Sequence, residues 1–148
     1  MTTFATGTRA PAPPLLEPAL NLEVEVEVEV EVEFEFDVAV VGLGYVGLPT
    51  ALAYAASGSR VLALDALPRR LEAIRTGDVD LLPSDRGRLA RSLGAAEFEL
   101  SVDASRLAQA AAIVVCVPTP VDDYLVPDLS LLRIACASVV AQARAGQV

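Results

Sequence analysis

The sequence predicts an α/β fold with a doubly wound parallel sheet, and three observations lead to that prediction. A short segment at 37–41, almost wholly apolar, is followed at once by three closely spaced glycines. An uncharged, alanine-rich segment of helical length comes next, at 45–57. A second short apolar segment, 60–64, then ends at an acidic residue, Asp65. Strand, glycine turn, helix and acid-terminated strand is the order of a dinucleotide-binding βαβ unit, so we expect a Rossmann-like domain.

Each residue type in this unit has a physical reason. Gly42 lets the chain turn sharply out of the strand, Gly44 leaves room for a pyrophosphate at the backbone, and Gly47 lets the helix lie close to the strand. The unpaired N–H groups at the start of the helix favour an anion. Asp65 would accept hydrogen bonds from ribose hydroxyls, and its charge would repel a 2′-phosphate. The predicted cofactor is therefore NAD rather than NADP.

Two simpler interpretations compete with this one. The stretch 38–59 carries no charge and is long enough to suggest a membrane span. Its glycines, its small residues and Pro49 instead favour a division into a strand and a helix. The glycines could also form a tight turn in a domain that binds nothing, but Asp65 at the end of the second strand favours a cofactor site.

Composition and charge exclude several classes of protein. A chain of 148 residues that is 53% hydrophobic can form one domain with a core. Its net charge of −9 is concentrated in residues 1–36, and the nearly neutral remainder has no basic patch for nucleic acid. Cys116 and Cys136 belong to no CxxC motif or Cys/His cluster, so we expect no metal and regard both as small apolar residues. Without a secretory signal in the sequence, we expect a cytoplasmic protein.

The first 36 residues differ from the rest of the chain. Residues 1–21 are rich in proline, and we expect them to be disordered. From 23 to 36, acids alternate strictly with valine or phenylalanine, the pattern of a strand with one apolar face. Glutamates along one face repel one another, so we interpret the repeat as a low-complexity extension; an acidic docking strand is the alternative. The predicted domains are thus an extension, 1–36, and a nucleotide-binding domain, 37–148.

The remaining sequence continues to alternate helices and strands. The expected helices are 67–76, 84–92, 103–110 and 129–143, and the expected strands are 97–101 and 112–117. We expect Ser84 or Asp85 to cap the second of these helices and Asp128 to cap the last. Thr119, between two prolines after the last strand, lies where ligands of open α/β sheets bind, although a stiffened turn explains it equally well.

No set of residues in the chain resembles a catalytic site. There is no histidine and no lysine, and the carboxylates of Asp122, Asp123 and Asp128 are better explained by a solvated loop. The sequence stops where a fifth strand would begin, so we expect a sheet of about four strands with an uncovered apolar edge. These residues therefore predict the nucleotide-binding half of a dehydrogenase, without the residues that would catalyse the reaction.

Four segments together resemble a known family. VAVVGLGYVGLPTA, VLALDALPRR, IVVCVPTPVDD and PDLSLL are similar to the NAD-binding N-terminal domain of the UDP-glucose/GDP-mannose 6-dehydrogenase family, over residues 37–148. GLGYVGLP with VPTP and a PDL segment resembles the UDP-N-acetylmannosamine and UDP-N-acetylglucosamine 6-dehydrogenase branch more than the UDP-glucose dehydrogenases. The resemblance implies an NAD-dependent, two-step oxidation of a nucleotide-sugar C6 alcohol to a carboxylate, through a thiohemiacetal and a thioester on a catalytic cysteine.

The resemblance also places cofactor contacts on individual residues. It puts backbone N–H groups of Tyr45 and Val46 at the pyrophosphate, Asp65 at the ribose, Arg70 near the adenosine, and Thr119 at the cofactor. The candidate cofactor-binding residues are Gly42, Gly44, Tyr45, Val46, Gly47, Asp65, Arg70 and Thr119.

The departures from the family pattern are informative. The second acid of the family is Leu67 here, and the catalytic Cys, Lys and Asn would lie beyond residue 148, so Cys116 is not the catalytic thiol. We expect a UDP-sugar substrate and a homo-oligomer only for a full-length enzyme, and no turnover by this chain alone. The alternative is a stand-alone, non-catalytic nucleotide-binding or interaction module.

Overall fold

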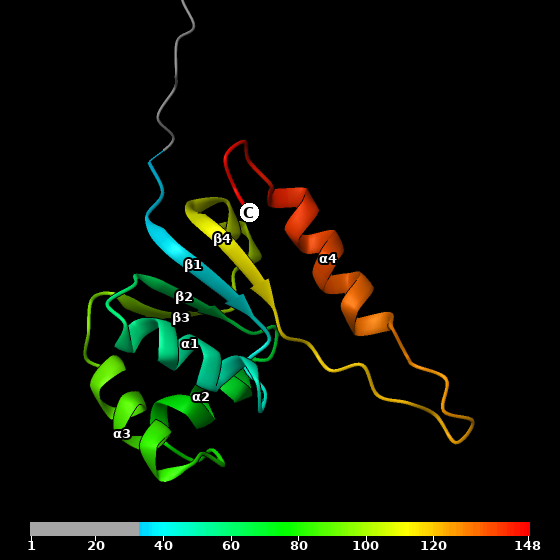
Figure 1. Ribbon diagram of the computed structural model, residues 1–148, viewed down its shortest axis with the longest axis horizontal. Helices are drawn as coiled ribbons and strands as arrows, with labels where there is room; N and C mark the ends of the chain where they lie inside the picture. Colours follow the sequence, from blue (N-terminus) through cyan, green and yellow to red (C-terminus); the bar gives the residue numbers. More distant parts are fainter. Residues whose placement is uncertain (1–32) are drawn as a thin grey trace, which may run out of the picture. The chain divides into compact units, whose positions relative to one another are not determined.

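The computed structural model describes residues 33–148 (Figure 1). The predictions for the proline-rich lead, and for the valine–glutamate repeat up to residue 32, lie outside the described residues.

The described domain is built on one parallel sheet, as the sequence predicts. Its four strands lie in the order β3-β2-β1-β4. The strands are β1 (Phe36–Val41), β2 (Val61–Leu64), β3 (Phe98–Ser101) and β4 (Ala110–Val115). The helices are α1 (Gly47–Ala56), α2 (Pro68–Thr76), α3 (Pro83–Ser92), the short 3₁₀ helix η1 (Ala104–Gln109) and α4 (Ser130–Gln142). The chain moves outward from β1 to β3 and then returns to the other side of β1, so a topological switch point lies between β1 and β4.

Both faces of the sheet are covered, which explains the unbroken apolar run in β1. Val38 and Val40 pack with α1 and α2 on one face, whereas Ala39 and Val41 pack with η1 and α4 on the other. Figure 1 shows α1, α2 and α3 gathered together and α4 beside β4. Alternate side chains of a strand point to opposite faces, so a strand buried on both faces needs apolar residues at every position.

The predicted cap of α3 is wrong. The helix begins at Pro83, and Leu82 precedes it without a side-chain cap. Proline suits the first position of a helix because it has no N–H group to leave unpaired. Asp85 lies buried in the first turn, where its carboxylate accepts a hydrogen bond from Arg88 at 2.8 Å. Its charge is thus used inside the helix, near the positive end of the helix dipole.

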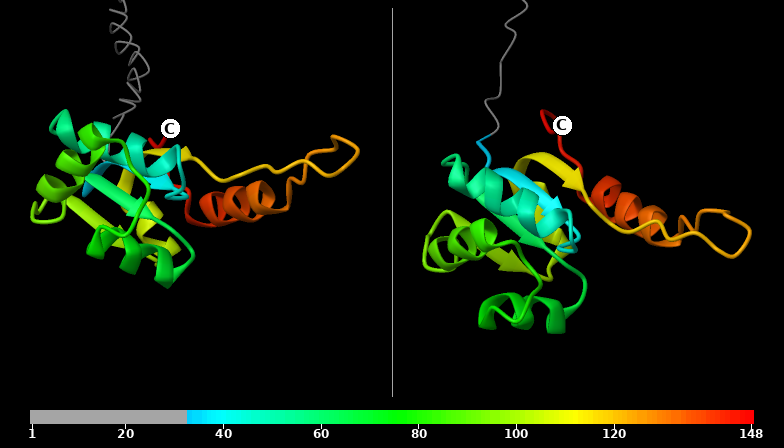
Figure 2. Two further views of the ribbon diagram at one scale, coloured as in Figure 1. Left: turned by 90° about the horizontal axis from the view of Figure 1, so that it is seen from below. Right: turned by 60° about the horizontal axis from the view of Figure 1, so that its bottom comes forward.

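The prediction for α4 is wrong by one residue. The helix starts at Ser130, and Leu129 occupies the capping position without a side-chain bond. Asp128 still accepts a hydrogen bond from the Ser130 N–H at 2.9 Å, and hydrogen bonding from Ser130 lowers the pKa of this carboxyl. The segment between β4 and α4 extends away from the sheet in both views of Figure 2.

The predicted bounds of β4 are also shifted. The strand occupies Ala110–Val115 rather than 112–117, because it pairs with β1 from Phe36 opposite Ala110 to Val41 opposite Val115 and ends where β1 ends. Its outer edge is less open than expected. Val148 donates to the carbonyl of Ala111 at 3.0 Å and accepts from the Ile113 N–H at 2.7 Å. The last residue of the sequence therefore pairs with β4.

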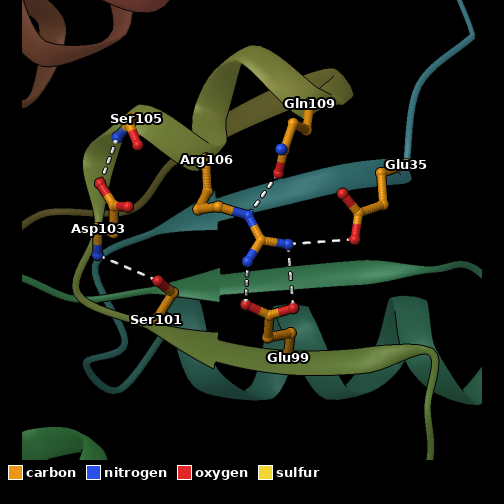
Figure 3. A network of polar contacts seen from close by, with 7 residues as sticks. All are labelled: Glu35, Glu99, Ser101, Asp103, Ser105, Arg106 and Gln109. Carbon is orange, nitrogen blue, oxygen red and sulfur yellow. Dashed lines mark hydrogen bonds and ion pairs between the residues drawn. The ribbon is translucent and has the colours of Figure 1, made fainter.

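One arginine links three elements on the face that carries η1 (Figure 3). Arg106 donates to both carboxylate oxygens of Glu99 on β3, at 2.7 and 3.1 Å, and to Glu35 at 3.2 Å. It also donates to Gln109, and its guanidinium lies 5.3 Å from the centroid of the Phe36 ring. This network joins β3, η1 and the start of β1.

The uncharged stretch at 38–59 divides into β1 and α1, as the sequence predicts. Across residues 33–148, no helix combines the length and apolar character needed to cross a membrane.

Candidate functional site

The glycine turn between β1 and α1 lies at the carboxyl edge of the sheet, where β1 and β4 end side by side (Figure 1). Gly42 has φ of 91°, and its N–H donates to the carbonyl of Leu64 at 2.8 Å. A Cβ on Gly42 would lie 2.8 Å from the Cys116 carbonyl oxygen, and a Cβ on Gly47 would lie 1.7 Å from the Gly42 carbonyl oxygen. The fold itself therefore requires glycine at both positions.

Gly44 is different from the other two glycines. A Cβ built on it would meet no protein atom within 4 Å, and its φ is not in the left-handed region. The fold does not need glycine here. A ligand that contacts the backbone from outside does need glycine at this position, because a side chain would fill the space through which the ligand approaches.

The turn presents several free backbone donors. Within residues 33–148, the N–H groups of Gly44, Tyr45, Val46 and Gly47 have no acceptor, and the first bonded amide is that of Leu48, which donates to Gly44 at 3.2 Å. No acidic side chain lies in the first turn of α1, and no side chain caps it. The side chains of Tyr45 and Val46 are exposed. Unpaired N–H groups and the positive end of a helix dipole make this an anion site.

Asp65 and Arg70 meet at the backbone of one residue, Leu43. The Leu43 N–H donates to Asp65 Oδ2 at 2.9 Å, and its carbonyl accepts from Arg70 Nε at 2.8 Å. The second carboxylate oxygen, Oδ1, accepts from the Leu67 N–H at 3.0 Å. Both side chains are half-buried, and the side chain of Leu43 is buried in the core. The end of β2 and the start of α2 are thus joined directly to the glycine turn.

The structure brings most of the predicted residues together but not all of them. The three glycines, Tyr45, Val46, Asp65 and Arg70 form one continuous edge. Thr119 follows β4 at the same edge and is exposed, and in residues 33–148 no hydrogen bond joins it to the other candidate residues. Three residues before Thr119, just after β4, the Cys116 N–H donates to the Val41 carbonyl at 2.7 Å and so joins this segment to the end of β1.

Sequence reasoning missed Leu43. Its contribution is made by backbone atoms, and the only signal was its place between two glycines. The acids after β4 behave as expected of a loop: Asp122 accepts from the N–H groups of Tyr124 and Val126, at 2.8 and 2.9 Å.

Two cavities lie away from the turn. One of about 410 Å³ is lined by the end of α1, α3 and the start of β3, and one of about 250 Å³ lies between α2 and α3. The glycine turn lines neither cavity. It lies at the carboxyl edge of the sheet beside the topological switch point, where ligands of open α/β sheets bind.

Residues 36–148 match the model of the UDP-glucose/GDP-mannose dehydrogenase family, NAD binding domain. The chain belongs to this family. The match covers every strand and helix of the described domain, including the glycine turn and Asp65. The cofactor of the domain is NAD, and the free donors and open approach at Gly44 fit its pyrophosphate.

Individual relatives agree with this assignment. The chain is 35% identical to a UDP-N-acetyl-D-mannosamine dehydrogenase of Pyrococcus horikoshii, over 68% of this chain and 24% of the relative. It is also 35% identical to a UDP-N-acetyl-D-glucosamine 6-dehydrogenase of Pseudomonas aeruginosa, over 68% of this chain and 23% of the relative. The chain therefore spans about a quarter of the length of the curated relatives that it matches.

The fold agrees as well. The solved structure of a UDP-D-ManNAc dehydrogenase from Pyrococcus horikoshii superposes with a TM-score of 0.69 and 31% identity, covering 75% of this chain and 27% of the other.

Proposed function

We propose that this chain serves as the NAD-binding part of a nucleotide-sugar 6-dehydrogenase that oxidises the C6 alcohol of a UDP-sugar to a carboxylate. The relatives named above support the substrate class, since they are dehydrogenases of UDP-N-acetylmannosamine and UDP-N-acetylglucosamine. The observation that carries the proposal is the glycine turn, where free N–H groups surround a glycine that the fold does not require.

The turn would hold the pyrophosphate. Gly44 lets the phosphates reach the backbone, and the N–H groups of Tyr45 and Val46 donate to their oxygens. Gly42 and Gly47 would act indirectly. Gly42 allows the backbone to pass close to the Cys116 carbonyl, and Gly47 allows the start of α1 to pass close to the Gly42 carbonyl.

Asp65 would hold the ribose. Each of its oxygens already accepts one backbone N–H, which fixes the orientation of the carboxylate before any ligand binds. A carboxylate has about four acceptor positions, so two remain for the ribose hydroxyls. The same negative charge disfavours the 2′-phosphate of NADP.

Arg70 and Thr119 complete the proposed site. Arg70 supports the glycine turn from behind, because its Nε donates to the Leu43 carbonyl at 2.8 Å. Thr119 follows β4 at the edge where the nicotinamide half of the cofactor would lie.

NAD supplies the hydride acceptor when it is bound; the residues described here bind and orient it. A sugar-oxidising protein that contains this domain would be homo-oligomeric, a proposal supported by the family resemblance alone. We also place it in the cytoplasm, in agreement with the two unpaired cysteines, Cys116 and Cys136.

Calorimetric titration of the chain with NAD tests the proposal. Asp65→Ala should weaken binding by about 1–3 kcal/mol, the usual loss for charge-assisted hydrogen bonds. Asp37→Ala is a matched control, because Asp37 is also an acid near the end of a strand but lies at the start of β1, away from the glycine turn, where it pairs with Arg60. A folded chain that does not bind NAD, or equal losses in the two variants, would refute the proposal.

A further inference from the structure

The backbone of Leu43 is held from both sides by side chains that are distant in sequence. Asp65, 22 residues away, binds its N–H, and Arg70, 27 residues away, binds its carbonyl. These two backbone groups belong to consecutive peptide planes. Asp65 fixes the plane between Gly42 and Leu43, and Arg70 fixes the plane between Leu43 and Gly44.

The second plane matters for phosphate binding. In a trans peptide the carbonyl and the N–H point in opposite directions. Because the Leu43 carbonyl is turned toward Arg70, the Gly44 N–H is turned away from it, and this N–H is one of the free donors of the turn. A flip of that plane would put a carbonyl oxygen where a phosphate oxygen is expected.

Little else prevents such a flip. Gly44 has no side chain, and even an added Cβ would meet no atom within 4 Å. Glycine adopts positive and negative φ with similar ease, so the plane before it can turn at low cost. Within residues 33–148, the Leu43 carbonyl accepts one hydrogen bond, from Arg70 Nε. This bond opposes the flip, because turning the peptide plane would break it.

We infer that Arg70 is a positioning residue for the glycine turn: by binding the Leu43 carbonyl it keeps the Gly44 N–H directed outward for the pyrophosphate of the cofactor. The role is distinct from a direct contact between its charge and the adenosine. The inference rests on the proposed function for its ligand, but the clamp itself is present without any ligand.

Two variants separate the two roles. The Nε2 of glutamine stands as many bonds from the backbone as the Nε of arginine, so Arg70→Gln keeps an N–H donor at the right place and loses the charge. The methionine of Arg70→Met has a side chain of similar length but carries neither the N–H donor nor the charge. Arg69→Met is the charge control, since Arg69 is the exposed neighbour of Arg70 and, within residues 33–148, makes no hydrogen bond to the glycine turn.

Binding of ADP-ribose and of adenosine gives the first measurement. If Arg70 positions the turn, Arg70→Met weakens ADP-ribose binding by about 3- to 10-fold, the range of one hydrogen bond, and leaves adenosine binding unchanged. Arg70→Gln and Arg69→Met should stay within about 2-fold of the unaltered chain. Equal losses in the glutamine and methionine variants, or a loss of adenosine binding, would show that the charge acts directly and would overturn the inference.

NMR spectroscopy without ligand gives the second measurement. The Leu43 carbonyl carbon and the Gly44 amide nitrogen share the peptide plane that Arg70 holds, so Arg70→Met should shift the resonances of both, whereas Arg70→Gln should leave them close to those of the unaltered chain. Identical chemical shifts at these two atoms in all three chains would refute the clamp. This result does not depend on cofactor binding, so a failure of the inference can be told apart from a failure of the proposed function.

Discussion

Gly47 faces the carbonyl oxygen of Gly42 so closely that a Cβ on Gly47 would lie 1.7 Å from it. A Cβ on Gly44, which lies between them in sequence, would meet no atom within 4 Å. The three glycines of one motif therefore serve two purposes. Gly42 and Gly47 allow the turn to close, because a Cβ at either position would clash with the backbone. Gly44 leaves the outer side of the turn open to a ligand.

This difference predicts opposite phenotypes for two identical changes. Gly47→Ala should lower the free energy of unfolding by about 2–4 kcal/mol, because a backbone clash cannot be relieved by a rotamer change. Gly44→Ala should change stability by less than about 1 kcal/mol and should still abolish most NAD binding. Urea denaturation and calorimetry check the pair. Equal destabilisation in the two variants would argue against the separation of roles.

Asp65 should also decide between the two dinucleotides. We expect the chain to bind NAD more tightly than NADP, because the carboxylate repels a 2′-phosphate. Asp65→Asn keeps an acceptor for the Leu43 N–H and removes the charge. It should reduce the preference for NAD by about 10-fold, as expected when one unfavourable charge contact is removed. An unchanged ratio of the two dissociation constants would show that another group discriminates.

The Arg106 network should contribute to stability rather than to binding. Its two bonds to Glu99 are partly shielded, and its contact with Glu35 is more exposed. Arg106→Met should lower the free energy of unfolding by about 1–2 kcal/mol, whereas Glu35→Gln should cost about 0–0.5 kcal/mol. Denaturation curves of both variants test this, with NAD affinity as the control. A loss of affinity without a loss of stability would contradict the structural role.

The pair of Asp37 and Arg60 should make stability depend on pH. Hydrogen bonds from the Arg60 side chain and backbone N–H hold the pKa of Asp37 below its ordinary value of 3.8. A lowered pKa in the folded state stabilises the fold above pH 3.8 and ceases to do so as the pH falls through the lowered value.

Asp37→Asn should therefore lower the thermal midpoint at neutral pH, and the two chains should converge in strong acid. Melting curves across this pH range measure the difference between the two thermal midpoints. A difference that does not change with pH would exclude the charge of Asp37 as its cause.

The chain should self-associate in solution. Val148 pairs with only part of the outer edge of β4, and the helix beside it exposes Ile134 and Val140. An open strand edge and an apolar helix surface both favour association. Light scattering should detect species larger than a monomer, and Val140→Lys should reduce them if the α4 surface is responsible. A monodisperse monomer at high concentration would contradict the prediction.

The order of elements could be predicted from the sequence because its signals are local. Apolar runs, glycine spacing and an acid at the end of a strand lie within 29 consecutive residues, 37–65, and report the βαβ unit without any knowledge of the rest. The parallel sheet follows from the same pattern, because strands buried on both faces lack polar positions.

Helix boundaries were less predictable, since side-chain partners compete there. Asp85 is a plausible cap in sequence, but it forms an ion pair with Arg88 within α3, and Pro83 starts the helix instead. The bounds of β4 depended on its register with β1, which no local signal records.

By itself, the sequence determined that this protein has a glycine turn, an acid and an NAD-binding fold, because these depend on residue types at short spacing. Only the tertiary structure decided how the turn is held. Asp65 and Arg70 bind the backbone of Leu43 across 22 and 27 residues, and a backbone group has no signature in the sequence. The physical reason is that a hydrogen bond to a main-chain atom depends on where the chain folds, and not on which side chain that residue carries.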